Sequence, residues 1–474
     1  MFIQLNDIDT FPKSDFPEFG DNMYELITEL YPICRSITGN GVRQTLNIIK
    51  KYIPLEIHEI PSGTNVFDWS IPKEWNIKDA YVKNSKGEKI IDFNKSNLHV
   101  LNYSIPINKK ISLSELKKHL FTLPDNPDWI PYRTSYYKDN WGFCLTHNQY
   151  ENLKEDEYEV VIESTLIDGY LTFGELLLKG ENEEEVLFSC YVCHPSMCND
   201  NLSGVSLLTF LAKYLMNKKL KYSYRFLFIP ETIGAITWLS INEKKVEKIQ
   251  HGLVATCLGD QGCLTYKKTR RGDAIIDRIV EKVLNDSCDE FQIIDFYPSG
   301  SDERQFSSPG FNLPIGSLTR TVYDKYPEYH TSADNLNFVK PDYLQDSFEK
   351  YVKVVSALEN DYEQSQIEIN RKNQKLSESY LIRSKAGKED ELIFENLYPK
   401  CEPNLGKRGL YDMIGGMKEK LDYKMPIFWI LNLSDGKNSL LDISKRSKIN
   451  FERIKNASKL LEGKGLIKPI HDNL

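Results

Sequence analysis

The sequence contains no long hydrophobic run, and this absence excludes one broad class of protein. None of its apolar segments approaches the roughly 18 consecutive apolar residues that a membrane-spanning helix needs. The first residues, Met1 to Asp7, also lack the basic stretch followed by an apolar stretch that marks an export signal. We therefore expect no membrane partner and a cytoplasmic location.

Cysteine and histidine are both scarce. The nine cysteines are odd in number and scattered in spacing, which argues against a disulfide framework and indicates reduced thiols. No segment recurs with the period of a solenoid repeat. Only eight histidines are present, so any two that occupy ligand-like loops are informative.

The chain has no excess of positive charge. The 474 residues include 60 Lys and Arg against 68 Asp and Glu, a formal net charge of −8, so the whole molecule is not built for nucleic acid or an anionic membrane. The hydrophobic fraction of 41% is ordinary for a globular protein and allows a large core. This length predicts roughly two to four domains.

One stretch carries the clearest chemical signal. An apolar strand, Val186–Val192, is followed closely by His194, and a polar loop then delivers Asp200. A helical pattern follows over Val205–Leu215. Strand, loop and helix in this order place ligand side chains at the carboxyl edge of an α/β sheet.

Two other interpretations of this stretch need weighing. Cys190-x-x-Cys193-His194 spells a c-type haem attachment motif, but haem attachment needs an exported chain and room that a buried strand does not offer. A thiolate zinc site of Cys190, Cys193 and Cys198 lacks a second Cys-x-x-Cys pair to close a tetrahedron. We interpret these cysteines as small core residues.

Further polar residues follow successive α/β elements. Glu231 comes directly after the strand Tyr224–Ile229, where a carboxylate is well placed as a general base. Asp260 follows the next strand, Gly252–Leu258. The other candidates are Asp302, Glu303 and Arg304 in a glycine-containing loop, His330 as the second well-placed histidine, and Arg133 and Tyr136, which could close over the cleft.

The chain divides into three predicted parts. Residues 1–62 and 164–395 form a discontinuous α/β domain that begins with helices over Met23–Cys34 and Arg43–Tyr52. Residues 63–163 contain short alternating strands and a proline-rich stretch, which is typical of a small inserted β-rich domain.

Residues 396–474 form the third part, and they resemble a winged helix-turn-helix domain. Helical patterns over Pro426–Leu433, Ser439–Arg446 and Phe451–Leu461 precede a short strand. From Lys407 onward this part has 14 Lys and Arg against 8 Asp and Glu, but its presumed recognition helix also carries Glu452. Nucleic acid is therefore one candidate partner, and a protein partner or a second copy of the chain, in a homo-oligomer, is at least as well supported.

The order of these residues resembles a known family. His194, Asp200-Asn-Leu-Ser-Gly, the Glu231 loop, Asp260, Ser301-Asp302 and His330-Thr-x-x-Asp334 are similar to zinc aminopeptidases of the leucyl aminopeptidase and glutamate carboxypeptidase type. Over essentially its whole length the chain resembles the bacterial aminopeptidase-like domain proteins associated with polysaccharide biosynthesis. This resemblance implies a zinc-exopeptidase-like mixed sheet flanked by helices, with an inserted β-rich domain and a C-terminal winged helix.

The resemblance also implies roles for individual residues. His194, Asp200, Asp260 and His330 would be metal ligands and Glu231 the general base. In the two-zinc enzymes a second glutamate follows the base, whereas here the next residue is Thr232, a poor zinc ligand. We therefore expect one zinc per chain, held by His194, Asp200 and His330. A two-metal site completed by Asp260 and a water is the alternative.

The predicted function is zinc-dependent hydrolysis of an amide bond in a small peptide-like or amino-sugar substrate. Asp302 or Glu303 could bind a free amino group, and Arg304 or Arg133 could bind an anionic group instead. One alternative is a non-catalytic protein that senses a metal or ligand and is coupled to the winged helix, which the loss of a ligand at Thr232 favours. A zinc-assisted transferase or cyclase is the third hypothesis.

Overall fold

An eight-stranded mixed sheet lies at the centre of the molecule. The structure, a computed structural model, describes residues 16–287, 290–369, 392–411 and 421–470. Across the sheet the strands follow in the order β1 (Glu56–Pro61), β10 (Tyr170–Leu178), β12 (Ser223–Ile229), β11 (Glu185–Tyr191), β13 (Ile249–Ala255), β16 (Ile315–Thr319), β14 (Leu264–Lys267) and β15 (Phe291–Ile294). Strands β12, β11, β13 and β16 are mutually parallel, whereas β10 and β14 join them antiparallel. The predicted mixed α/β sheet is confirmed.

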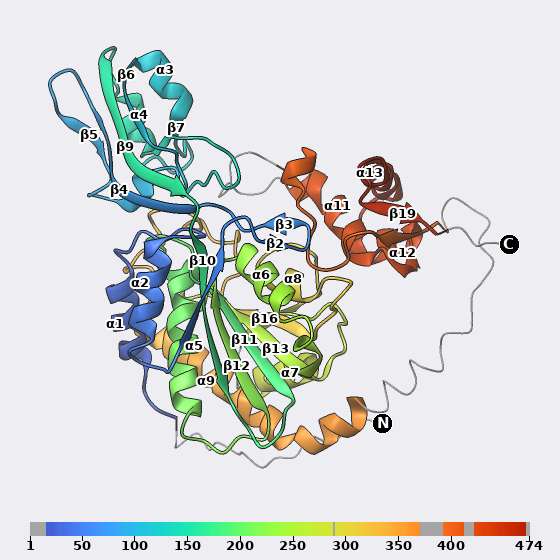
Figure 1. Ribbon diagram of the computed structural model, residues 1–474. Coiled ribbons are helices and arrows are strands. Elements are labelled where there is room, and N and C mark those ends of the chain that lie inside the picture. The colour runs from blue at the N-terminus through green and yellow to red at the C-terminus, as the bar shows by residue number, and fades with distance from the viewer. Residues whose placement is uncertain (1–15, 288–289, 370–391, 412–420, 471–474) are drawn as a thin grey trace.

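Helices cover both faces of this sheet because its central strands are apolar on both sides. Every residue of β11 and β12 is buried, and side chains of β11 alternate between two cores, with Phe188 in one and Leu187 in the other. Figure 1 shows the helices on either side of the sheet. They are α1 (Gly20–Leu30), α2 (Asn40–Ile49), α5 (Ser203–Leu215), α6 (Ile233–Ile241), α7 (Ile275–Ser287), α8 (Glu303–Phe306) and α9 (Pro341–Asn360).

The two N-terminal helices exist as predicted but begin and end earlier. The predicted helix over Met23–Cys34 ends at Leu30, and Pro32 just beyond it has no backbone N–H with which to continue the helical hydrogen bonds. The second helix begins at Asn40, three residues before the predicted start. Gly39 there has a φ of 95°, a conformation that only glycine adopts readily, and it turns the chain into the helix.

The predicted β-rich insertion is a four-stranded antiparallel sheet. Its order is β5 (Lys89–Asp92), β4 (Glu74–Lys83), β9 (Glu157–Ile167) and β6 (Ile107–Ser112). The long strand β9 continues to Ile167, so the central sheet resumes with β10. Shorter elements nearby are β2 (Asn65–Val66), β3 (Trp69–Ser70), α3 (Leu113–Leu116), β7 (Leu120–Phe121), β8 (Phe143–Cys144) and α4 (His147–Glu151).

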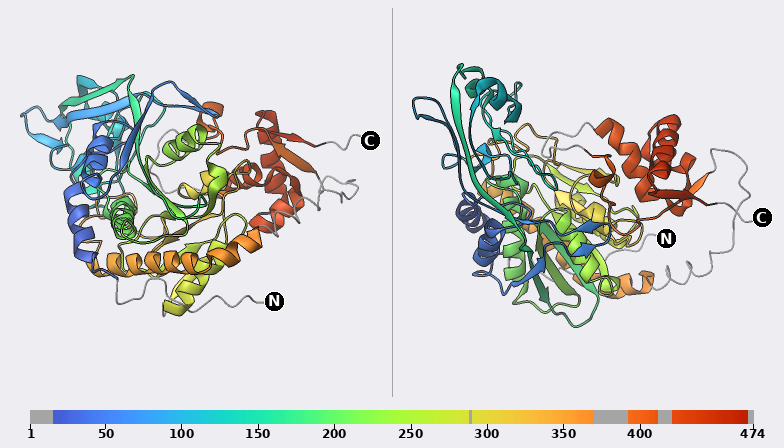
Figure 2. Two further views of the ribbon diagram at one scale, coloured as in Figure 1. Left: turned by 60° about the horizontal axis from the view of Figure 1, so that its bottom comes forward. Right: turned by 45° about the horizontal axis from the view of Figure 1, so that its top comes forward.

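Within its described residues the C-terminal part contains three α-helices and a three-stranded sheet, and in Figure 2 it lies beside the main domain. Its elements are β17 (Ile393–Asn396), α11 (Leu421–Leu433), β18 (Asp435–Ser439), α12 (Leu440–Ser447), α13 (Phe451–Gly463) and β19 (Ile467–Pro469). Ser439 caps α12 through a reciprocal pair of hydrogen bonds with Asp442, which accounts for the predicted helix start.

Within the described residues, no helix combines the length and the apolar character that crossing a bilayer requires. The first residues, on which the expectation about an export signal rests, lie outside the described ranges. The exact domain boundaries stay predictions.

An ion pair joins the inserted sheet to the main domain and generates a stability prediction. Arg43 of α2 binds both carboxylate oxygens of Glu74 of β4, at 2.7 and 2.6 Å, and this pairing lowers the pKa of Glu74 to about 2. Because this pKa is depressed below its unfolded value, the pair stabilises the fold above about pH 4 and loses that contribution as the pH falls towards 2.

We predict that Glu74→Gln lowers the free energy of unfolding at pH 7 by about 1–2 kcal/mol, after allowance for solvent screening. The difference from the wild type should shrink as the pH is lowered from 5 to 3. Glu59→Gln is the matched control, because Glu59 pairs with the same Arg43 but its side chain is 39% exposed. Urea unfolding at several pH values measures this. Equal effects of the two variants, or a pH-independent effect of Glu74→Gln, would contradict the assignment.

Candidate metal centre and substrate cavity

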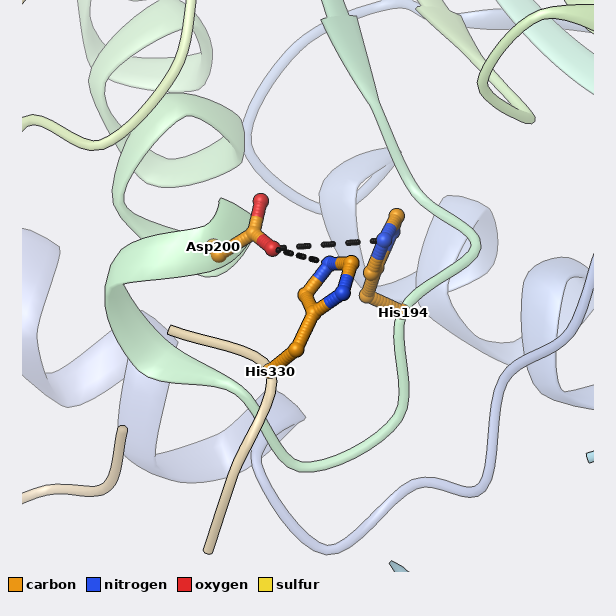
Figure 3. A group of neighbouring side chains, drawn as sticks. All are labelled: His194, Asp200 and His330. Atoms are coloured by element: carbon orange, nitrogen blue, oxygen red, sulfur yellow. Dashed lines mark ion pairs between the residues drawn. The ribbon is translucent and has the colours of Figure 1, made fainter. Parts of the chain in front are cut away.

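Three predicted ligand residues meet at the carboxyl edge of the central sheet. His194, Asp200 and His330 each offer one ligand atom, and these atoms lie within 4.8 Å of one another. Oδ2 of Asp200 lies 3.0 Å from Nε2 of His330 and 4.0 Å from Nε2 of His194. Figure 3 shows both imidazoles turned towards this one carboxylate oxygen. The structure therefore brings His330 to two residues of the loop after β11, from which it is far away in the sequence.

His194 is held in place from behind by a buried arginine. It follows β11, and its backbone carbonyl accepts a 2.8 Å hydrogen bond from Nε of Arg35. Arg35 is fully buried, also donates to the carbonyl of Leu30, and forms no ion pair among the described residues. Burying an arginine without a carboxylate partner costs free energy. The hydrogen bond from Arg35 to the loop that carries His194 accounts for the position of this arginine. Sequence analysis did not identify Arg35, because its loop contains no metal-ligand pattern.

Asp200 is fully buried and is oriented by neighbours on two sides. The hydroxyl of Tyr191 donates to its Oδ1, and the same hydroxyl lies 2.7 Å from Oγ1 of Thr256. The carboxylate of Asp334 accepts the backbone N–H groups of Asn199 and Asp200, at 2.6 and 2.9 Å. Burial raises the pKa of Asp334 to about 8. Asp200 is therefore fixed through both its side chain and its backbone.

The chemistry of this group fits a zinc ion. Imidazole nitrogen and carboxylate oxygen are common zinc ligands, and three protein ligands with a position left open are typical of catalytic sites. Burial lowers the pKa of His194 to about 4, which keeps its ring neutral and able to donate a lone pair. Oδ2 of Asp200 is buried and makes no hydrogen bond of regular geometry within the described residues. A cation between the three side chains would satisfy this oxygen.

The cysteines of the same stretch take no part in the group. Cys190, Cys193 and Cys198 are buried free thiols, and they belong to the hydrophobic cores. Cys193 accepts the backbone N–H of Glu231 at 3.2 Å. Their burial in the cores agrees with their interpretation as core residues.

Glu231 lies beside the group at the end of β12. Its Oε2 is 3.8 Å from Nε2 of His194, and its side chain, which is 27% exposed, lines a large cavity. Burial raises the pKa of Glu231 well above its ordinary value, and the nearby carboxylates of Asp302 and Asp200 raise it further. The predicted base therefore borders both the ligand group and the space where a substrate would bind.

Thr232 adopts an unusual backbone conformation next to this glutamate. Its φ is 63°, which is strained for a β-branched residue, and its N–H donates to Oδ1 of Asp302 at 2.6 Å. Its hydroxyl lies 3.3 Å from Nη2 of Arg304. The guanidinium of Arg304, which also pairs with Glu402, thus lies beside the residue that takes the place of the second glutamate in the resemblance to the two-zinc enzymes.

Asp260, predicted as a ligand, lies outside the group. Its oxygens accept hydrogen bonds from the side chains of Asn199 and Thr321, at 2.8 and 2.6 Å, and from the backbone of Gly262 at 2.6 Å. These donors occupy the lone pairs that a metal would need. Asp260 therefore orients Asn199, the residue before Asp200.

The remaining predicted residues separate into those that face the cavity and those that support it. Arg304 and Tyr136 line the cavity, but Arg133 is absent from its lining and donates to the carbonyl of Tyr132. Asp302 and Glu303 are fully buried below the cavity surface. Burial raises the pKa of Asp302 to about 7, and Glu303 pairs with the buried Lys267 at 2.7 Å. Neither carboxylate is presented to a substrate as the sequence suggested.

The cavity has a volume of about 1130 Å³ and is lined by all three parts of the chain. Tyr132 and Tyr136 come from the insertion, whereas Glu402 and Asn404 precede the helices of the C-terminal part. Glu402 pairs with Arg304 at 2.7 Å. The contribution of the C-terminal part escaped sequence analysis because nothing in residues 402–407 resembles a motif.

Comparison with solved structures identifies the fold. The zinc aminopeptidase BSAP from Bacillus subtilis is similar with a TM-score of 0.53 at 12% identity, over 72% of this chain and 95% of that one. The fold is therefore that of the zinc aminopeptidases, as the sequence resemblance implied.

Family models then place the chain more narrowly. The model described as "Domain of unknown function (DUF4910)" matches residues 24–361, and a winged helix-turn-helix model matches residues 392–469. The chain belongs to the DUF4910 family and carries a C-terminal winged helix.

Two comparisons cover nearly the whole chain, and both involve Clostridium acetobutylicum. A protein named "Putative polysaccharide biosynthesis protein with aminopeptidase-like domain" is 57% identical over 451 residues, which are 95% of this chain and 97% of that protein. A crystal structure described as a "putative peptidase" has a TM-score of 0.71 at 55% identity, covering 96% and 97% of the two chains. The predicted relationship to aminopeptidase-like domain proteins is confirmed.

The position of Asp260 generates a prediction that separates a ligand from a supporting residue. We predict that Asp260→Asn keeps the zinc stoichiometry of the wild type but weakens zinc affinity about ten- to a hundredfold, because the amide disturbs the donors around Asn199. Chelator competition measures the affinity, and Asp286→Asn on the exposed side of α7 is the neutral control. Complete loss of zinc from Asp260→Asn would show instead that Asp260 is a ligand.

Proposed function

We propose that the chain is a zinc-dependent hydrolase of an amide bond with an aminopeptidase-like site. The observation that supports this most strongly is the group of His194, Asp200 and His330 with Glu231 beside it, 3.8 Å from His194, on a cavity of about 1130 Å³. Two imidazoles and a carboxylate form a three-ligand zinc site, and a neighbouring carboxylate on the cavity surface supplies a base.

Each residue has a role in this proposal. A zinc ion held by the three ligands would polarise the amide carbonyl and make a water molecule more acidic. Glu231 accepts the proton of the attacking water and returns it to the leaving amine. Arg35 keeps the backbone of His194 in position, and Tyr191 keeps Asp200 in position. The Arg304–Glu402 pair beside Thr232 restricts the site to one zinc per chain.

The substrate class follows from the size of the cavity and from the family. A small peptide-like molecule or an N-acylated amino sugar has the required amide bond. The name of the relative from C. acetobutylicum refers to polysaccharide biosynthesis, which supports the carbohydrate alternative. No carboxylate other than those of Glu231, Asp324 and Glu402 lines the cavity within the described residues, and Glu402 is paired with Arg304. Asp302 and Glu303 therefore do not serve as the amino-group anchor.

The general-base role is tested by Glu231→Gln, which preserves the shape of the side chain but cannot accept a proton. We predict that turnover of a library of aminoacyl amides and N-acylated amino sugars falls about 10²- to 10⁴-fold. Zinc content should stay unchanged, because Glu231 is not a ligand. The control is Glu243→Gln, because Glu243 is a surface residue paired with Lys400. This variant should turn over substrate at the wild-type rate.

Two outcomes would contradict the proposal. Normal turnover by Glu231→Gln would exclude this residue as the base. A zinc-loaded wild type that turns over no member of either class, while zinc changes its association state, would favour a non-catalytic regulatory protein.

We also propose that the C-terminal part, which includes the winged helix, forms part of the cavity wall and does not bind nucleic acid. Its leading segment supplies Glu402 and Asn404 to the cavity wall. The side chains that α13 exposes include Glu452 and Glu462 as well as Arg453 and Lys459, so this helix lacks the uniform positive charge that attracts phosphates.

We predict that the full chain shows no binding to a 20-base-pair duplex tighter than the roughly 10⁻⁴–10⁻⁶ M typical of non-specific association near physiological salt. Fluorescence anisotropy at several salt concentrations measures this. Submicromolar, salt-dependent binding that Arg453→Glu removes would contradict the proposal.

A further inference from the structure

A pair of aromatic side chains forms a distinct part of the cavity wall. Trp69 of β3 and Tyr137 both line the cavity, and their rings meet edge to face with centroids 5.2 Å apart. Both come from the insertion, whereas the metal ligands come from the main domain. This pair has no role in the proposed bond cleavage.

Tyr137 is exposed within the cavity. Its side chain is 45% exposed and forms part of the cavity lining. Its φ of 63° is a costly conformation for a bulky residue. A large apolar ring is thus held, at a cost in strain, where it meets whatever fills the cavity.

Trp69 is fixed by the C-terminal part of the chain. Its indole N–H donates to the backbone carbonyl of Glu402 at 2.8 Å. The adjacent Asp68 accepts the backbone N–H of Asn404 at 2.7 Å and pairs with Lys407 and Arg408. The segment 402–408 is therefore clamped against β3, and the orientation of the indole is set before any ligand binds.

Polar side chains line the same cavity as the two rings. They include those of Lys138, Glu402 and Asn404. A pyranose ring fits both features, because its C–H face packs on an aromatic ring while its hydroxyl groups bond at the edges.

The size of the cavity agrees with a ligand of more than one unit. Pockets for drug-sized molecules usually span roughly 300–1,000 Å³, and this cavity of about 1130 Å³ is larger than that range. An amide bond beside His194 and Glu231 would leave space for a sugar ring against the aromatic pair.

We infer that Trp69 and Tyr137 form a sugar-binding subsite, which takes a pyranose ring of an amide-bearing glycoside. This inference rests on the proposed amide hydrolysis for the rest of the substrate, but the subsite itself requires neither zinc nor turnover. Trp69 and Tyr137 are specificity residues in this account, and they act through contact with the sugar.

The subsite is tested by binding to the metal-free full-length protein, so that catalysis does not contribute. The probes are the methyl glycosides of N-acetylglucosamine, N-acetylgalactosamine and glucose, detected by saturation-transfer NMR and titrated for Kd. We expect the wild type to bind at least one of them. Trp69→Ala and Tyr137→Ala should each weaken that Kd about tenfold, and Tyr137→Phe should stay within about twofold because it keeps the ring.

The control is Tyr170→Ala, because Tyr170 is similarly exposed at 43% but lies outside the cavity lining. Trp69→Phe, which retains an aromatic face, tests whether a loss in Trp69→Ala comes from misfolding. Lack of binding to every pyranoside, or equal affinity in the wild type and both alanine variants, would overturn the inference. If the wild type binds a glycoside but Glu231→Gln turns over substrate at the normal rate, the subsite is supported and the proposed role of Glu231 is contradicted.

Discussion

The buried carboxylate of Asp200 is the constraint on which the rest of the site depends. A fully buried charge needs partners, and Asp200 has Tyr191 on one oxygen and two imidazoles facing the other. Its backbone is held in turn by Asp334, and the neighbouring Asn199 is held by Asp260. The acidic residues around the centre thus divide between those that face the histidines and those that hold the loop. A cation at Oδ2 would complete the set of partners.

The three parts of the chain are joined around this centre. The main domain supplies the ligands and Glu231, the insertion supplies the aromatic wall, and the C-terminal segment closes the cavity through Glu402. Each junction relies on a buried or half-buried ion pair, such as Glu74 with Arg43 and Asp68 with Arg408. The winged helix therefore forms part of the same structural unit as the cavity. The two additions to the aminopeptidase fold both shape the space beside the proposed site of cleavage.

Much of this architecture could be predicted from the sequence because its signals are local. The strand that ends before His194, the loop to Asp200 and the residue types of the C-terminal helices are all read from short patterns. The family resemblance implied that Asp260 is a ligand, but the donors that bind its oxygens come from residues 199 and 321, which no local pattern connects to it. Arg35 was missed for the same reason, since its contact with His194 spans 159 positions. The aromatic wall depends on how the insertion packs against residues 402–408, and such packing has no sequence signature.

Metal content per chain tests the central claim most directly. Zinc measured by mass spectrometry on purified protein, together with chelator competition, should give close to one zinc in the wild type. His194→Ala and His330→Ala should each reduce it to background while keeping the fold, because the two residues share one site. Retention of zinc by either variant, or a stoichiometry of two in the wild type, would contradict a single centre built on Asp200.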